Sequence, residues 1–341
     1  MQSIESLVDT HKPTAATVTS SVLTGILANP TSQGLSQYKA AIERAMRYEK
    51  CSMLHGDERL ACVLVAAMCS LGALISESVP GRISMELDPR LAYDTDGLVK
   101  RAKATCEQFQ SMGVSTDRLL IRLPGTWEGI QAAKSLEQEG IATHVILVYS
   151  FVQAVAAAQA GCSVIQPNVG HIRDWFSKNP GAIRDPRGPR QDSGGLFQDT
   201  DNPAIKMVEK IYNYCKQQHP DVKIMAAGVR SKQEALELAG VDYIVLSPRV
   251  LDALSQTPTL QGYNDGLRVA DEQEGVHTQL CPANAKEARF TPEETAPVTK
   301  QLFQEGLGQV GMELLDTGVQ RLVDDITRLE TSLREYAVGS E

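Results

Sequence analysis

The chain of 341 residues predicts an α/β fold with a parallel sheet covered by helices on both faces. From about residue 80 onward, short apolar runs rich in β-branched residues alternate with longer stretches of helical periodicity. Almost continuously apolar strands separated by helices are typical of parallel sheets, because both faces of such strands are buried. The alternation alone does not separate a closed barrel from a doubly wound sheet. No GxGxxG motif follows a predicted strand, which disfavours a dinucleotide-binding fold.

The elements follow in a regular order. The first predicted strand, Ala16–Ser20, has the weakest pattern. Six further strands consist mostly of apolar residues: Arg82–Leu87, Leu119–Leu123, Thr143–Val148, Ser163–Gln166, Lys223–Ala227 and Tyr243–Leu246. The predicted helices have apolar residues at helical spacing: Leu35–Tyr48, Arg59–Val79, Thr95–Gly113, Thr126–Glu139, Phe151–Ala160, Ala204–Gln217, Ser231–Leu238 and Met312–Tyr336. A single domain over residues 1–341 is the simplest organisation, since α/β barrels of about 250 residues and more are common.

Two segments do not have the pattern of core elements. Asp185–Asp201 is rich in glycine, proline and charge and follows the predicted strand Ser163–Gln166. It is either a solvated insertion or a substrate lid, because barrel active sites lie at the carboxyl ends of the strands. Gly275–Pro297 precedes the last helix and is predicted to be a surface connection.

Composition favours a small-molecule partner. The net charge is −9 and no run of Lys or Arg is present, which argues against nucleic acid. The start, MQSIESLVDTHKP, lacks the features of a secretory leader, and no apolar run predicts a membrane span, so a cytoplasmic protein is expected. Seven cysteines without a CxxC pair predict reduced thiols.

Five blocks carry a resemblance to a known family. They are GRISMELDPRLAYDTDGLVKRA, LLIRLPGTWEGIQAAKSLEQEGI, SFVQAVAAAQAGCSVIQPNVGHIRDW, VEKIYNYCK and EALELAGVDYIVLSP. In order and spacing they resemble the transaldolases, and the resemblance extends from about Ser3 to Leu333. It implies a (β/α)8 TIM barrel of transaldolase type, with a C-terminal helix packed on the barrel. Site residues can change while such a scaffold persists.

Arg122 stands where the resemblance places the catalytic lysine of the transaldolases. That lysine attacks the ketose carbonyl as a free amine and forms a Schiff base. A guanidinium stays protonated in proteins and its nitrogen lone pairs are delocalised, so it cannot act as this nucleophile. The sequence therefore predicts that the protein is not a Schiff-base aldolase.

Other positions of the implied site also depart from the family. Glu86 matches a glutamate that acts there through a water as acid and base. His144 and Ile146 replace an asparagine and a threonine that hold this water and the substrate. Where the family has SPFVGRI, this chain has Gln166, Asn168 and His171 in place of the serine, the phenylalanine and a phosphate-binding arginine. A second phosphate-binding arginine of the family is retained here as Arg230. A serine near it in the family is replaced by Gly228.

The N-terminus departs most from the family. An ATTNPS strand, whose asparagine contacts substrate, corresponds here to ATVTSS, with Thr19 at the asparagine position. A gap-free match leaves no residues for the family's first strand and its catalytic aspartate, so that strand is abnormal or missing. The alternative match pairs Asp9 with this aspartate but deletes most of a helix.

Together these positions predict a polar cluster at the barrel mouth. We expect Glu86, His171 and His144 to be catalytic, and Arg122, Arg230, Asn168, Gln166 and Thr19 to bind substrate, with no metal or cofactor. The expected function is a barrel repurposed for non-covalent acid/base chemistry of lyase, isomerase or cyclase type on a small polar or anionic molecule. One alternative is a catalytically inactive binding protein. The second is retained transaldolase activity in the pentose phosphate pathway. A homodimer is compatible with the sequence.

Overall fold

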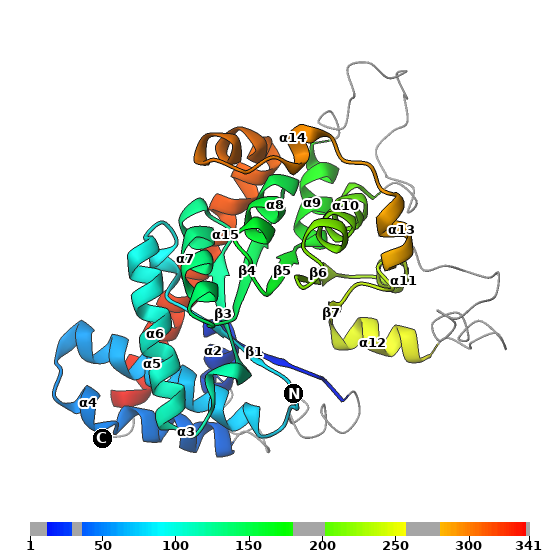
Figure 1. The fold of residues 1–341 in the computed structure, drawn as a ribbon. Coiled ribbons are helices and arrows are strands. Elements are labelled where there is room, and N and C mark those ends of the chain that lie inside the picture. Colours follow the sequence, from blue (N-terminus) through cyan, green and yellow to red (C-terminus); the bar gives the residue numbers. More distant parts are fainter. Residues whose placement is uncertain (1–11, 29–35, 180–201, 257–279, 339–341) are drawn as a thin grey trace. The chain divides into compact units, whose positions relative to one another are not determined.

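The computed structural model of the protein describes residues 12–28, 36–179, 202–256 and 280–338 (Figure 1). These residues form an α/β fold whose sheet has the strand order β1-β2-β3-β4-β5-β6-β7. Parallel strands in chain order with intervening helices are the topology of a (β/α) barrel, so the predicted fold class is confirmed. Contacts group the chain into two compact units, Met1–His144 with Thr317–Glu341, and Val145–Asp316.

The first unit begins with β1 and extends to the start of β4. Its elements are β1 (Ala16–Val18), α2 (Ser20–Ala28), α3 (Ser36–Met46), α4 (Glu49–Ser52), α5 (Gly56–Ser76), β2 (Ile83–Glu86), η1 (Pro89–Leu91), α6 (Thr95–Ser111), η2 (Thr116–Arg118), β3 (Leu119–Pro124), α7 (Trp127–Gln138) and the start of β4 (Thr143–Val148). β1 pairs with β2 and β2 with β3, both in parallel. The helices α5, α6 and α7 contact these strands and one another.

Alternation along the strands separates an apolar face from a polar face in this unit. Ile83 and Met85 of β2 are buried on one side, and Met85 and Leu87 lie against apolar side chains of α5. Ser84 and Glu86 point to the opposite side, because successive strand residues face opposite ways. Burying each large apolar side chain on the helix-covered face contributes about 1.5–3 kcal/mol, which fixes the register of the sheet and hence the polar face.

The second unit contains the remaining strands. Its elements are the rest of β4, α8 (Phe151–Gln159), β5 (Val164–Pro167), α9 (Val169–Lys178), α10 (Pro203–Gln218), β6 (Lys223–Val229), α11 (Lys232–Glu237), β7 (Tyr243–Leu246), α12 (Pro248–Ser255), α13 (Pro282–Glu287) and α14 (Pro292–Thr295). β5, β6 and β7 pair in parallel, with an irregularity between Ala226 and Val229. The predicted connection Gly275–Pro297 contains two short helices where it is described.

The C-terminal helix α15 (Lys300–Val338) starts earlier than the predicted Met312 and bends at Gly308, whose φ is 61°. In the second unit, Glu313 of this helix accepts a hydrogen bond from the indole of Trp175 at 2.7 Å. In the first unit, Ile326 is buried and Glu330 pairs with Arg90 at 2.9 Å. Each unit therefore packs against its own part of α15, as the sequence predicts for this helix.

Three sequence predictions lie outside the described residues in whole or in part. Asp9 and the place of the family's first strand fall on residues 1–11, and the proposed lid Asp185–Asp201 falls on residues 180–201. The ATVTSS strand itself is present as β1, although it is only three residues long. An abnormal first strand, the single-domain organisation and the lid all stay predictions.

Two statements from the sequence need correction. Cys51 of α4 and Cys62 of α5 form a disulfide, whereas reduced thiols were predicted throughout. The two residues are only 11 positions apart, and the turn between α4 and α5 brings them together. The helix α5 is also long and apolar enough to cross a membrane, although no such run was expected. Half of its apolar stretch is buried within the structure.

Candidate active site

The first unit presents a row of polar residues on one face of its strands. Glu86 of β2 lies opposite Arg122 of β3 in the strand register, so both side chains share this face. His144 at the start of β4 joins the row, because its Nδ1 is 2.8 Å from Oγ of Ser84. Of the predicted site residues, the structure therefore brings Glu86, Arg122 and His144 to one face of the first unit.

Glu86 is almost fully buried, with 5% of its surface exposed, and it is held by one residue from α2. The hydroxyl of Ser20 donates to Oε1 of Glu86 at 2.5 Å, and the backbone N–H of Ser20 donates to the same oxygen at 3.1 Å. Sequence reasoning missed Ser20. A signal was present, since Ser20 stands where the ATTNPS motif has proline, and proline has no N–H or hydroxyl to donate.

The charges of Glu86 and Arg122 are shaped by burial. Burial raises the pKa of Glu86 and outweighs the charge of Arg122 and the hydrogen bonds from Ser20, which lower it; Asp325 raises it further. Burial lowers the pKa of Arg122, against the charge of Glu86, although a guanidinium stays protonated. Within the described part of the chain, Glu86 Oε2 and Arg122 Nε are buried without a hydrogen-bond partner. A carboxyl with one free oxygen beside a cation is suited to proton transfer.

Two other predicted residues of the first unit have evident structural contacts. His144 is fully buried, and Ser84 fixes the orientation of its ring. Thr19 precedes α2, where its Oγ1 accepts from the N–H of Val22 at 3.4 Å and lies 3.0 Å from the hydroxyl of Ser21. A hydroxyl in this place acts as a helix cap, so a substrate contact by Thr19 stays a prediction.

Asn168 and His171 lie at the start of α9 in the second unit. The side chain of Asn168 caps this helix by accepting from the N–H of His171 at 2.9 Å. The Nδ1 of His171 is 3.1 Å from the hydroxyl of Tyr149, and the two rings stack. Gln166 is buried on β5, with 9% of its surface exposed. These predicted residues therefore gather around the carboxyl end of β5.

Gly228 allows β6 to approach Asn168 closely. Its φ is +75°, and a Cβ at this position would lie 2.5 Å from Oδ1 of Asn168 and 2.8 Å from the backbone nitrogen of Gly170. The serine expected here from the family would collide with both atoms and be strained. The departures at Gly228 and Asn168 are thus sterically linked.

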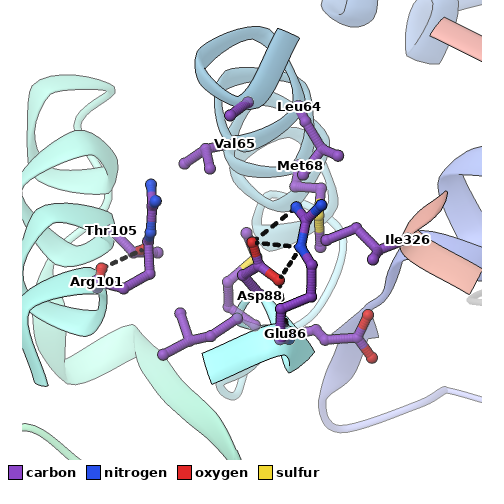
Figure 2. Close-up of a pocket in the computed structure, with 12 residues that line it drawn as sticks. Leu64, Val65, Met68, Glu86, Asp88, Arg101, Thr105 and Ile326 are labelled. Carbon is purple, nitrogen blue, oxygen red and sulfur yellow. Dashed lines mark hydrogen bonds and ion pairs between the residues drawn. The ribbon is translucent and has the colours of Figure 1, made fainter. Parts of the chain in front are cut away.

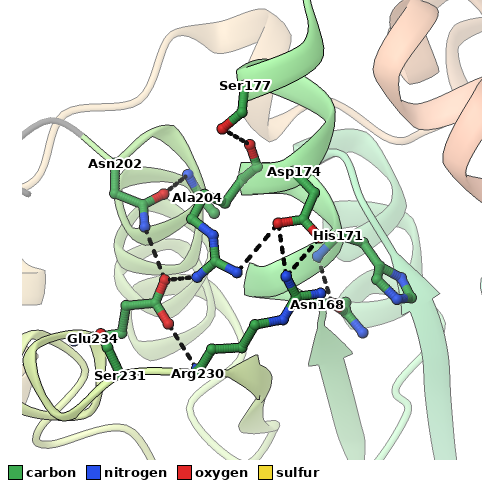
Figure 3. A network of polar contacts seen from close by, with 10 residues as sticks. Asn168, His171, Asp174, Ser177, Asn202, Ala204, Arg230, Ser231 and Glu234 are labelled. Carbon is green, nitrogen blue, oxygen red and sulfur yellow. Dashed lines mark hydrogen bonds and ion pairs between the residues drawn. The ribbon is translucent and has the colours of Figure 1, made fainter. Parts of the chain in front are cut away.

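Arg230 follows β6 and takes part in a network of ion pairs (Figure 3). Its guanidinium is 2.7 Å from the carboxylate of Asp174, and its side chain is 53% exposed. Arg173 bonds to both Asp174 and Glu234, while the backbone N–H of Arg230 donates to Glu234 at 2.8 Å. Burial alone would raise the pKa of Asp174, but the hydrogen bonds and charges of the two arginines hold it below its ordinary value.

A small cavity in the first unit is lined by apolar residues of α5 and by Glu86, Asp88 and Arg90. It has a volume of about 20 Å³, room for about one water molecule, and lies between β2, α5 and α6. Figure 2 shows the carboxylate of Glu86 directed away from Leu64 and Val65, while Asp88 binds the guanidinium of Arg90. Among the described residues, no three His, Cys, Asp or Glu side chains form a metal-binding group.

The predicted site residues thus form two sets. Glu86, Arg122, His144 and Thr19 belong to the first unit, and Asn168, Gln166, His171 and Arg230 to the second. Glu86, Thr19 and the second set lie at or near the carboxyl ends of their strands, where parallel barrels place their active sites, whereas Arg122 lies within β3 and His144 near the start of β4. That both sets form one cluster stays a prediction, as do the catalytic and substrate-binding roles.

Comparison with known proteins gives consistent matches. Residues 2–333 match the family described as Transaldolase/Fructose-6-phosphate aldolase. The transaldolase of Bos taurus is 32% identical over 338 residues, which cover 98% of this chain and 89% of that protein. The transaldolase of Homo sapiens is 31% identical with the same coverage, and that of Chlamydia muridarum is 35% identical over 83% of this chain and 78% of its own.

These matches correct the functional expectation. A barrel repurposed for lyase, isomerase or cyclase chemistry was expected because the residues implied by the resemblance have changed. The relatives matched over nearly the whole chain are transaldolases, which contradicts that expectation and supports the alternative of retained transaldolase activity. The expectation was wrong because it gave changed individual positions more weight than the similarity of the whole chain.

Proposed function

Since the chain belongs to the transaldolase/fructose-6-phosphate aldolase family, we propose that it is an enzyme with transaldolase activity on phosphorylated sugars. The observation that carries this proposal is the similarity to transaldolases over 98% of the chain. The presence of Glu86 at the matching acid/base position supports it. A phosphorylated sugar also fits the small polar or anionic partner expected from the predicted site residues.

In this proposal Glu86 is the proton-transfer group of the first unit. It removes the proton from the ketose hydroxyl next to the carbon–carbon bond that breaks, and the aldehyde fragment leaves. The electron pair of that bond forms a double bond to the carbonyl carbon, and the carbonyl π pair moves onto the oxygen, so that the remaining fragment becomes an enediolate. This fragment then attacks the carbonyl of the acceptor aldose, and Glu86 returns the proton. His144 contributes to the same proton transfer from its fixed position beside Ser84.

Arg122 takes a different role from the lysine that the resemblance implies there. We propose that its guanidinium stabilises the enediolate oxygen by charge and hydrogen bonding, without an imine at this residue. Its buried Nε, without a partner among the described residues, leaves a donor for such an oxygen. Thr19 binds the same end of the substrate. In the second unit, Arg230, Asn168, Gln166 and His171 are proposed to bind a phosphate group, with His171 also able to carry a proton.

The test uses the purified full-length chain with fructose 6-phosphate and erythrose 4-phosphate. Formation of glyceraldehyde 3-phosphate is followed by a coupled assay, and borohydride trapping with intact mass measurement detects an imine. We expect turnover without a substrate adduct, and a loss of at least about 100-fold in Glu86→Gln. Glu139→Gln, which changes an exposed carboxylate paired with Lys103, serves as control. Absence of turnover contradicts the activity, and an adduct on any lysine contradicts the imine-free role of Arg122.

Cytoplasmic location and a homodimer also stay proposals. Disulfides are rare in the cytosol, so the Cys51–Cys62 bond bears directly on the location. Thiol labelling in intact cells, followed by mass spectrometry of both peptides, should find these cysteines mostly reduced if the protein is cytoplasmic.

A further inference from the structure

Ser20 donates hydrogen bonds to only one of the two carboxyl oxygens of Glu86. Its hydroxyl and its backbone N–H both donate to Oε1, from a residue 66 positions away in the chain. Ser20 is fully buried and Glu86 is nearly so. Two donors on one oxygen restrict rotation of the carboxyl group, and bonds to an ionised acceptor are stronger than neutral ones.

The fold accounts for this contact. Val18, the last residue of β1, lies opposite Met85, and Glu86 is the next residue of β2. Ser20 begins α2 two positions after Val18, so its N–H belongs to the first turn of a helix and has no partner within that helix. The carboxyl of Glu86 satisfies this donor.

The other oxygen, Oε2, is buried and has no hydrogen-bond partner among the described residues. Buried polar atoms without partners are rare in native proteins and call for an explanation such as a bound group. Arg122 lies opposite Glu86 in the strand register, and its Nε is likewise buried without a hydrogen-bond partner among the described residues. The carboxyl thus has one anchored oxygen and one that keeps its full bonding capacity.

We propose that Ser20 is a positioning residue for Glu86: it anchors Oε1 and so presents Oε2 as the oxygen that exchanges a proton with the substrate. Only the identity of that substrate rests on the proposed function. The family motif ATTNPS has proline at this position and can supply neither donor, so the interaction is a feature of this chain.

The proposal has a consequence for the charge of Glu86. Both donors bond better to the carboxylate than to the neutral acid, so they favour ionisation. In the described part of the chain, the charged groups that shift the pKa of Glu86 are Arg122 on β3, which lowers it, and Asp325 on α15, which raises it. Neither is altered by a change at Ser20. A shift in the titration of Glu86 in Ser20 variants therefore reports the lost hydrogen bonds.

The experiment uses three variants of the full-length chain: Ser20→Thr, Ser20→Ala and Ser20→Pro. Proline is tolerated at the first position of a helix, so the last variant removes both donors while α2 can still form. The matched control is Ser21→Ala, which removes an exposed hydroxyl on the same helix that bonds to Thr19 rather than to Glu86. The titration midpoint of the Glu86 carboxyl is measured by carbon-13 NMR and assigned with Glu86→Gln.

We expect the midpoint to rise by about one pH unit in Ser20→Ala and by more in Ser20→Pro. In Ser20→Thr and Ser21→Ala it should stay near that of the parent. The acidic limb of the pH profile of kcat/KM for sugar phosphates should move with it. A midpoint in Ser20→Ala equal to that in Ser21→Ala overturns the proposal. A shifted midpoint in a chain that turns over no sugar phosphate supports the role of Ser20 and contradicts only the proposed reaction.

Discussion

The polar groups of the two units differ in how completely they are satisfied. In the first unit, Glu86 is 5% exposed and one of its oxygens has no hydrogen-bond partner among the described residues. In the second, the side chain of Arg230 is 53% exposed and forms an ion pair with Asp174, which is 38% exposed. The first arrangement keeps charge away from water with incomplete bonding. The second neutralises charge close to water.

This difference bears on which polar groups can be replaced by a ligand and which are suited to catalysis. Ion pairs near the surface contribute about 0–1 kcal/mol, because water stabilises the separated charges nearly as well. Arg230 can therefore exchange Asp174 for another anion at low cost. Buried groups with shifted pKa values are more typical of catalytic positions, since their charge depends on one or two neighbours. Single substitutions in the two regions test this contrast.

The largest effect is expected for Arg122→Met compared with Arg230→Met. Removing Arg122 leaves the carboxylate of Glu86 buried without a counter-charge, which should lower the free energy of unfolding at pH 8 by about 3–5 kcal/mol. The same change at Arg230 should cost about 1 kcal/mol or less. Urea denaturation followed by circular dichroism measures both.

A pH series and a charge-preserving variant control this comparison. The loss in Arg122→Met should become smaller as pH falls, because protonation of Glu86 removes the buried charge. Arg122→Lys should lose less than Arg122→Met because it keeps a cation. Equal destabilisation by Arg122→Met and Arg230→Met would remove the distinction between the two regions.

An intermediate effect is expected at Glu234, the buried member of the second network. Its side chain is 7% exposed and accepts from Arg173, from the Asn202 amide and from the backbone N–H of Arg230. Glu234→Gln places an amide donor against these donors and should cost about 2 kcal/mol in thermal unfolding. Glu237→Gln on the same helix is the control and should stay within about 0.5 kcal/mol of the parent. A loss below that of the control would mean that the network adds nothing.

The strands could be predicted well from the sequence, because their signal is local. Thr143–Val148 and Tyr243–Leu246 match β4 and β7 in both bounds, since each is a short apolar run with clear flanking residues. The early start of α15 at Lys300 was missed because the bend at Gly308 interrupts its periodicity. Asn168 as a helix cap could also have been predicted, as it precedes a helical run.

The contacts of the site could be predicted only in part. Motif positions identified Glu86 and Arg122, and the strand register of the structure places them opposite each other. The bonds from Ser20 to Glu86 join residues 66 positions apart and depend on how α2 leaves β1. Periodicity contains no information on that geometry. Nor did cysteine spacing reveal the Cys51–Cys62 disulfide, which depends on the turn between two helices.

A smaller effect is expected in the pH dependence of stability. The pKa of Glu86 is raised in the folded protein, so between the ordinary glutamate value and the raised value the folded state binds a proton that the unfolded state lacks. Stability from this group is therefore lost as pH rises through that window, by up to about 1.4 kcal/mol per pH unit. Glu86→Gln removes the titration, so its stability relative to the parent should increase with pH. For the control Glu139→Gln, the difference in free energy of unfolding from the parent should not change with pH. The same result for Glu86→Gln would contradict the raised pKa.

The smallest effect is expected at Asn168, and it separates two roles of one side chain. As the cap of α9 it accepts from the N–H of His171, so Asn168→Ala should lower the free energy of unfolding by about 1 kcal/mol. Asn168→Asp keeps an acceptor and adds a negative charge at a helix N-terminus, so its stability should match or exceed that of the parent. The same charge would repel a phosphate group, so affinity for fructose 6-phosphate, measured by calorimetry, should fall in Asn168→Asp. Unchanged affinity in this variant would restrict Asn168 to its structural role, and Ser177→Ala on the same helix should change neither quantity.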